Sequence, residues 1–197
     1  MKSFAQLPEG YLPLRQIDLQ ADRRAFWSVN GLALAILVVL AAAGALLVPL
    51  ETVFSANGVG GFVAKAVVMI AGSIAYIFGH EWVHGIFMKH FSGVKAHYGF
   101  TGLYAYAGSS VYFCKRHYRV IALAPIVLWG VLLAVLNLVL PRGWFWPIYF
   151  IQMTNLSGAA GDLYVSLLLR NYPAETLIQD SGMAMIVYGC SNPIENA

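Results

Sequence analysis

Four segments of this sequence are each long and apolar enough to cross the hydrocarbon core of a membrane. A membrane-spanning α-helix needs about 20 predominantly apolar residues, and the segments at 26–49, 62–88, 118–140 and 144–169 meet that requirement. The whole chain agrees, because only 11% of its residues are charged, against about 25% in an ordinary soluble domain. The sequence therefore predicts an all-α membrane protein with about four transmembrane helices.

The positions of Lys and Arg predict how the chain is oriented. Cytosolic loops carry an excess of these residues, and the opposite loops offer only Arg142, with Lys65 just inside the second segment. We therefore expect a cytosolic N-terminal segment at 1–25, a transmembrane core at 26–170 and a short cytosolic tail at 171–197. Both termini are then cytosolic, and nucleic-acid binding is not expected, because the basic residues are few and flank the membrane. The Lys and Arg residues on which the predicted cytosolic side rests are Arg15, Arg23, Arg24, Lys89, Lys95, Lys115, Arg116, Arg119 and Arg170.

The connection between the second and third segments is rich in Gly, Tyr and small residues over 94–113. Aromatic residues with β propensity between turn glycines predict a short hairpin or a re-entrant loop. Such a loop could hold an extended peptide by adding it as a strand, or it could be a structured cytosolic loop that touches lipid headgroups. In the tail, residues 182–188 predict a strand that could pair with residues 14–19.

The second apolar segment contains the run His80-Glu81-Trp82-Val83-His84, an HExxH motif. Residues four apart on a helix lie within about 40° of each other, so both imidazoles can reach one metal ion. Glu81 then lies close enough to act on a water bound to that metal. A solvent-facing surface helix is the usual alternative, but the flanking residues here are apolar. Because ionisable groups are costly inside a membrane segment, the motif indicates a zinc site.

A catalytic zinc normally takes three protein ligands, so the chain must supply one more. Asp162 is the only acidic residue inside the other three predicted spans, at a depth comparable with that of His84. His90 is the alternative ligand. Its spacing from His84 is that of a longer zinc motif in which a Gly breaks the helix, although Phe87 stands at that Gly position. Asp162 is therefore the preferred third ligand.

Asn155 lies seven residues before Asp162, and hence on the same face of a helix. Its amide could donate to a substrate carbonyl or orient a metal ligand. Alternatively, it only bonds a neighbouring helix. We expect Asn155 to contact the substrate or to orient a metal ligand.

The order of these features resembles the site-2-protease class of intramembrane metalloproteases. The shared features are HExxH on one transmembrane helix, a β-prone loop, Ala124-Pro125 near the start of the next helix, and Asn155 followed by Asp162 on a later one. The chain resembles still more closely the bacterial membrane proteins described as putative zincin peptidases. The similarity covers roughly residues 62–170, and it implies a multi-pass protein of the bacterial plasma membrane.

The resemblance also implies hydrolysis of peptide bonds within or at the cytosolic edge of the membrane. Zinc would be held by His80, His84 and Asp162, and Glu81 would be the general base and then the general acid. The expected partners are the lipid bilayer and a membrane-protein or peptide substrate. One alternative is a non-proteolytic metal-binding scaffold or transporter, although transporters typically use more helices and paired repeats. The other is a membrane zinc hydrolase that acts on a lipid or a small amide.

Overall fold

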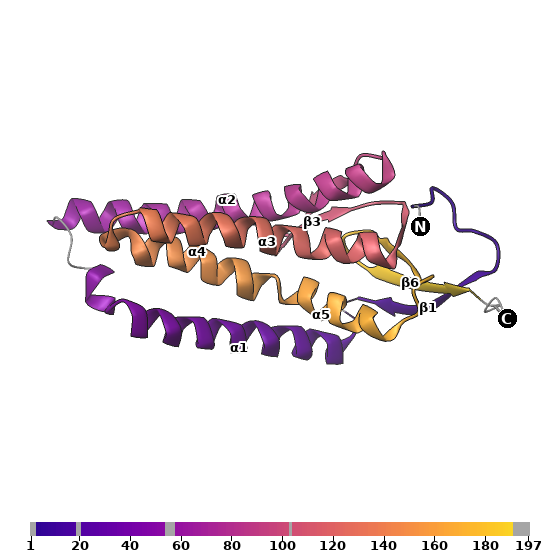
Figure 1. The fold of residues 1–197 in the computed structure, drawn as a ribbon, viewed down its shortest axis with the longest axis horizontal. Helices are drawn as coiled ribbons and strands as arrows, with labels where there is room; N and C mark the ends of the chain where they lie inside the picture. Colours follow the sequence, from indigo (N-terminus) through magenta and orange to yellow (C-terminus); the bar gives the residue numbers. More distant parts are fainter. Residues whose placement is uncertain (1–2, 19–20, 54–57, 103, 191–197) are drawn as a thin grey trace. The chain divides into compact units, whose positions relative to one another are not determined.

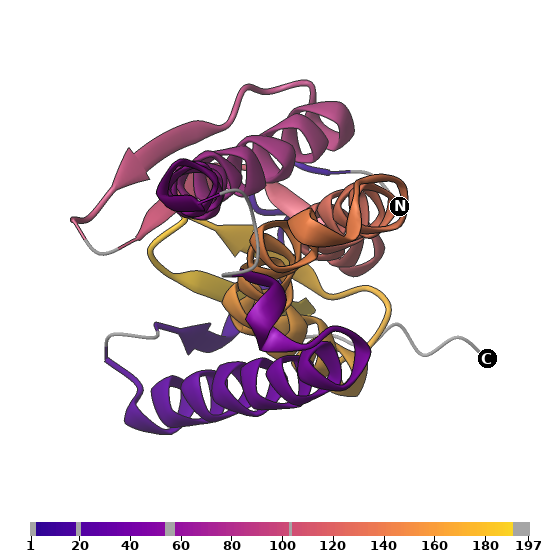
Figure 2. The same ribbon diagram turned by 90° about the vertical axis from the view of Figure 1, so that its left-hand side faces the viewer.

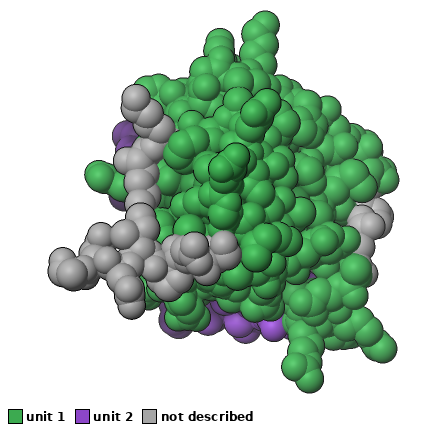
Figure 3. All heavy atoms as spheres, turned by 90° about the vertical axis from the view of Figure 1, so that its right-hand side faces the viewer, with its two compact units in different colours: residues 1–27, 81–124, 162–197 green, residues 28–80, 125–161 purple. Residues whose placement is uncertain are grey.

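The computed structural model describes residues 3–18, 21–53, 58–102 and 104–190 (Figure 1). In these residues the chain is mostly helical, with some antiparallel strands. They form two compact units, which Figure 3 colours separately. Unit 1 comprises residues 1–27, 81–124 and 162–197, and unit 2 comprises residues 28–80 and 125–161.

Unit 2 is built from helices. It contains nearly all of α1 (Arg23–Leu47), the first part of α2 (Gly58–Ser92), the second part of α3 (Lys115–Val139) and α4 (Phe145–Gly158). Of these, α1, α2 and α3 are long and apolar enough to cross a membrane. They correspond to the first three predicted spans. Two short 3-10 turns, η1 (Leu50–Val53) and η2 (Arg142–Trp144), complete this unit.

The fourth predicted span, 144–169, is not a single helix. It divides at Ala159 into α4 and α5 (Ala160–Leu168), and the turn η3 (Leu169–Asn171) follows. The division falls in the run 157–161, Ser-Gly-Ala-Ala-Gly, where two glycines lower helix propensity by about 1 kcal/mol each. The described residues therefore contain three helices of spanning length, where the sequence predicts about four.

Unit 1 contains a four-stranded antiparallel sheet with the strand order β1-β6-β5-β4. An all-α fold is thus a wrong prediction for this part of the chain. The predicted pairing of the tail with the N-terminal segment is confirmed, because Arg15 lies opposite Val187 and Ile17 opposite Met185; Leu19 lies outside the described residues. The strands are β1 (Tyr11–Ile17), β4 (Tyr112–Cys114), β5 (Leu177–Asp180) and β6 (Met185–Cys190).

A separate two-stranded hairpin joins α2 to the strand β4. It consists of β2 (His97–Phe100) and β3 (Ala105–Gly108), so the predicted hairpin is confirmed. In Figure 2 it lies as an arm beside the C-terminal part of α2. A Cβ atom at Gly85 would clash with the Tyr98 hydroxyl, so this glycine leaves room for the Tyr98 side chain to lie against the helix.

The core of unit 1 ties its helices to the sheet. Phe113 of β4, Ile178 of β5 and Val187 of β6 have no exposed surface, and they share one apolar cluster with Met88 of α2 and Ile121 of α3. Burial of large apolar side chains is the main force that holds such a core together. The C-terminal part of α2, which carries most of the HExxH motif, is therefore fixed on the sheet.

Candidate metal centre

The two histidines of the HExxH motif are buried and lie one turn apart on α2. The unit boundary falls between His80 and Glu81. Because α2 continues without interruption to Ser92, the helix itself sets the position of His80 relative to His84. Both imidazoles therefore lie on one face of the helix, as the spacing predicts.

Each imidazole is oriented through its Nδ1 atom. The Nδ1 atom of His84 lies 2.9 Å from the carbonyl oxygen of Ile121, which can only accept a hydrogen bond. The Nδ1 atom of His80 lies 2.7 Å from the Tyr76 hydroxyl, which itself donates to the carbonyl oxygen of Asn155 at 3.3 Å. When the His80 Nδ1 atom carries the ring proton, it donates to the Tyr76 oxygen, and the single hydroxyl hydrogen of Tyr76 goes to the Asn155 carbonyl. In each neutral ring the Nε2 atom then carries the lone pair that a metal needs.

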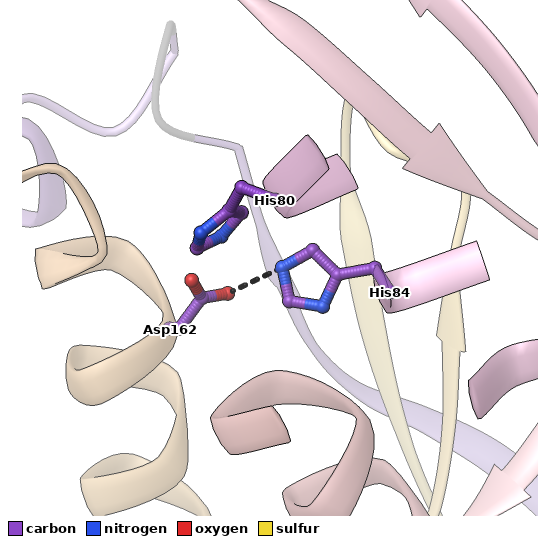
Figure 4. A group of neighbouring side chains, drawn as sticks. All are labelled: His80, His84 and Asp162. Carbon is purple, nitrogen blue, oxygen red and sulfur yellow. Dashed lines mark ion pairs between the residues drawn. The ribbon is translucent and has the colours of Figure 1, made fainter. Parts of the chain in front are cut away.

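Asp162 lies beside these histidines, in the first turn of α5. Its Oδ1 atom lies 3.4 Å from the Nε2 atom of His84, and one ligand atom from each of His80, His84 and Asp162 lies within 4.8 Å of the other two (Figure 4). Ligands of a tetrahedral zinc, each about 2.0–2.2 Å from the ion, are separated by roughly 3.4 Å. The donor set of two imidazoles and one carboxylate therefore fits zinc.

Glu81 is oriented by the hairpin. Its Oε2 atom accepts a hydrogen bond of 2.7 Å from the backbone N–H of Ala107 in β3. Tyr98, opposite Ala107 in β2, is also close to this carboxylate. Burial raises the pKa of the Tyr98 hydroxyl, and the negative charge of Glu81 adds to the rise. Glu81 is thus a half-buried carboxylate next to the candidate metal ligands.

The structure separates the other two candidates from this cluster. His90 is exposed and contacts Phe91 edge-on, because α2 does not break at Phe87. Asn155 is fully buried in unit 2, where its Nδ2 atom lies 3.4 Å from the carbonyl oxygen of Ile126. Its backbone oxygen, through Tyr76, is linked to His80. A role of the Asn155 side chain in orienting a ligand or a substrate stays a prediction.

Three groups that orient the site are missing from the sequence-based prediction. Tyr76 could have been found, because it precedes His80 by one helical turn and so lies on the same face. The carbonyl oxygen of Ile121 and the N–H of Ala107 are backbone groups. Since every residue type except proline offers both groups, no sequence pattern identifies them.

Comparison with known families supports the chemistry of this site. Residues 73–177, more than half of the chain, match the model of a family described as "Putative zincin peptidase". The chain belongs to this family. No curated protein and no solved structure matches it.

The family match covers the whole candidate metal centre. It includes Tyr76, the HExxH motif, the β2–β3 hairpin and Asp162. It ends at Leu177, so it leaves out β1, β6 and the turn between β5 and β6. Membership of this family suggests a metallopeptidase that uses zinc.

Proposed function

We propose that this protein is an integral-membrane zinc metallopeptidase that hydrolyses peptide bonds within or at the cytosolic edge of the membrane. The convergence of His80, His84 and Asp162, with ligand atoms within 4.8 Å of one another, carries this proposal. Three protein ligands are the usual number at a catalytic zinc, which keeps its fourth position open. The family match supports the same reaction class.

The residues around the centre divide the chemistry among them. Zinc, when bound, supplies an acidified water and polarises the scissile carbonyl. Glu81 takes the proton of the attacking water and returns it to the leaving amine. The N–H of Ala107 holds the Glu81 carboxylate in place between these two steps.

The outer edge of β3 is the proposed binding site for the substrate backbone. The N–H of Ala107 donates to Glu81, so it points away from β2. Hydrogen-bonded and non-hydrogen-bonded pairs alternate along an antiparallel ladder, and Ala105, two residues earlier in β3, therefore also directs its backbone groups away from β2. An extended peptide can add to this edge at Ala105, and its backbone would then lie next to the Ala107 N–H that is bonded to Glu81.

The length and composition of α1, α2 and α3 support a membrane location. The N-terminal strand β1 pairs with the C-terminal strand β6 in one sheet. This pairing supports the proposal that both termini share one side of the membrane. The excess of Lys and Arg in these segments favours the cytosolic side, and the resemblance to bacterial membrane families favours the bacterial plasma membrane.

The test is metal analysis and peptide cleavage by the protein purified in detergent. We expect about one zinc per chain, lost in the double variant His80→Ala/His84→Ala. Glu81→Gln should keep the metal and lose cleavage of single-span membrane peptides, read by mass spectrometry, whereas Glu175→Gln, at an exposed acidic residue of the same unit, should keep both. Unchanged cleavage by the Glu81→Gln protein would overturn the mechanism, and unchanged zinc in the double variant would overturn the site.

A further inference from the structure

The turn between β5 and β6 is organised around Asp180. The Oδ2 atom of Asp180 accepts a hydrogen bond of 2.5 Å from the Tyr118 hydroxyl, and its Oδ1 atom accepts one of 2.7 Å from the N–H of Gly182. Its backbone oxygen accepts a third, of 2.7 Å, from the N–H of Ser109. Burial raises the pKa of Asp180, and the hydrogen bonds from Tyr118 and Gly182 oppose that rise. One side chain thus joins the turn to α3, and its backbone joins it to the segment after β3.

The same turn packs directly on the hairpin. Gly182 has a φ of +80°, and a Cβ atom there would lie 2.2 Å from the Tyr106 ring and 3.0 Å from the carbonyl oxygen of Ala107. On the hairpin side, the Nε2 atom of His97 lies 3.2 Å from the carbonyl oxygen of Ser181. The turn therefore touches β3 at the residue whose N–H holds Glu81.

The helix α3 connects this turn to the metal ligand His84. Tyr118 bonds Asp180, and Ile121, one turn further along α3, accepts the hydrogen bond of His84. The general base and one metal ligand are thus supported from one short stretch of α3. Catalysis depends on such distances, because a displacement of about 1 Å can lower a rate by about a hundredfold.

From these contacts we infer that Tyr118 and Asp180 are positioning residues that hold β3, and through it Glu81, in register with the metal ligands. This inference rests on the proposed function for its effect on catalysis, but the contacts themselves can be tested without activity. It assigns a role to the β5–β6 turn, which lies outside the segment that matches the family.

The first test measures backbone hydrogen exchange in zinc-free protein. In Tyr118→Phe the Asp180 carboxylate loses a donor, so the amides of residues 105–108 should exchange about tenfold faster, because protection reports local stability. The control is Tyr11→Phe, which removes a tyrosine hydroxyl bonded to the Glu175 carbonyl in the same unit. Unchanged exchange at 105–108 in Tyr118→Phe, or an equal change in Tyr11→Phe, would overturn the inference whether or not the protein is a peptidase.

The second test separates positioning from stability by kinetics. In Tyr118→Phe and Asp180→Ala, kcat per bound zinc should fall about tenfold with KM and zinc content unchanged. Asp180→Asn keeps an acceptor for Tyr118 or Gly182 and should recover part of kcat. Loss of zinc in proportion to kcat would show a merely structural role and contradict the inference.

The third test uses the glycine at the contact. Gly182→Ala puts a side chain at a left-handed position and makes it clash with Tyr106. Gly93→Ala also puts a side chain at a left-handed position, φ +74°, but nothing lies within 4 Å of its new Cβ atom. We expect a lower kcat and faster exchange at 105–108 in Gly182→Ala alone. Equal effects in the two variants would mean that backbone strain, not the contact with β3, is responsible.

Discussion

The two units of this protein differ in how they bury large apolar side chains. Unit 1 has a closed core, where Ile178 is 0% exposed, although other apolar side chains of this unit, such as Trp82 and Phe100, lie on its surface. In unit 2 many large apolar side chains lie on the surface, and Ile70 of α2 is 64% exposed. Helices within unit 2 instead meet at glycines, because a Cβ atom at Gly72 would lie 2.4 Å from the Ile151 side chain and one at Gly44 2.5 Å from the Tyr149 ring.

This difference indicates that one chain is suited to two solvents. A closed apolar core is stabilised by the removal of apolar surface from water. Helices in lipid gain nothing from covering apolar side chains, so they associate through close packing at small residues and through hydrogen bonds. The core of unit 1 follows the first rule and the helix contacts of unit 2 follow the second, which agrees with the proposed membrane location of the helices in unit 2.

The candidate metal centre gives the largest expected effect, and Asp162 belongs to it from unit 1. Asp162→Ala should lower zinc affinity about a thousandfold, or about 4 kcal/mol, since it removes one of three protein ligands. His90→Ala, at an exposed residue of the same unit, should leave zinc affinity unchanged. Competition with a coloured chelator measures both. The reverse order would place the third ligand on α2 itself.

Two isoleucines, one buried in unit 1 and one exposed in unit 2, test this difference in burial. Ile178→Ala should lower the free energy of unfolding of unit 1 by about 3 kcal/mol, because it leaves a cavity in a closed core. Ile70→Ala should cost less than about 1 kcal/mol, because lipid or detergent fills the space of an exposed side chain. Chaotrope unfolding in detergent, followed by fluorescence, compares them. Similar losses at both positions would contradict the contrast between the units.

Lysine substitutions test which surface faces lipid. Ile70→Lys should reduce membrane insertion by about 2.5 kcal/mol, the cost of a lysine near the centre of a span. Leu12→Lys changes a side chain that is 57% exposed in β1 of unit 1 and should have no such effect. The inserted fraction after synthesis with membrane vesicles is the measurement. Normal insertion of Ile70→Lys would show that α2 does not face lipid there.

The smallest effect concerns the support of His80 from within unit 2. Tyr76→Phe removes the hydroxyl that bonds the Nδ1 atom of His80, so zinc affinity should fall about tenfold, as for other groups that orient metal ligands. The Tyr11→Phe variant should keep full zinc affinity, because the Tyr11 hydroxyl that it removes donates to the Glu175 carbonyl and not to a candidate metal ligand. A normal affinity in Tyr76→Phe would mean that the helix alone orients His80.

Several local features could be predicted because their patterns are periodic. Helical spacing predicted that His80 and His84 share a face, and depth along the predicted spans predicted Asp162 beside them, where the structure places it. The hairpin at 97–108 and the pairing of the tail with the N-terminal segment were also predictable from β-prone residues between turns. The interruption at Ala159 was not, because the apolar pattern continues through 144–169 and hides the effect of the glycines.

The sequence by itself determined the long apolar helices, the HExxH face of α2 and the identity of the three candidate metal ligands. Only the tertiary structure decided which groups support the residues of the site. The Ile121 carbonyl bonds His84, the Ala107 N–H bonds Glu81, and the turn at Asp180 packs on β3. The physical reason is that helical and strand periods are written in side chains, whereas these supports are mostly backbone groups common to all residues. Their partners lie far along the chain, and folding alone brings them within hydrogen-bond distance.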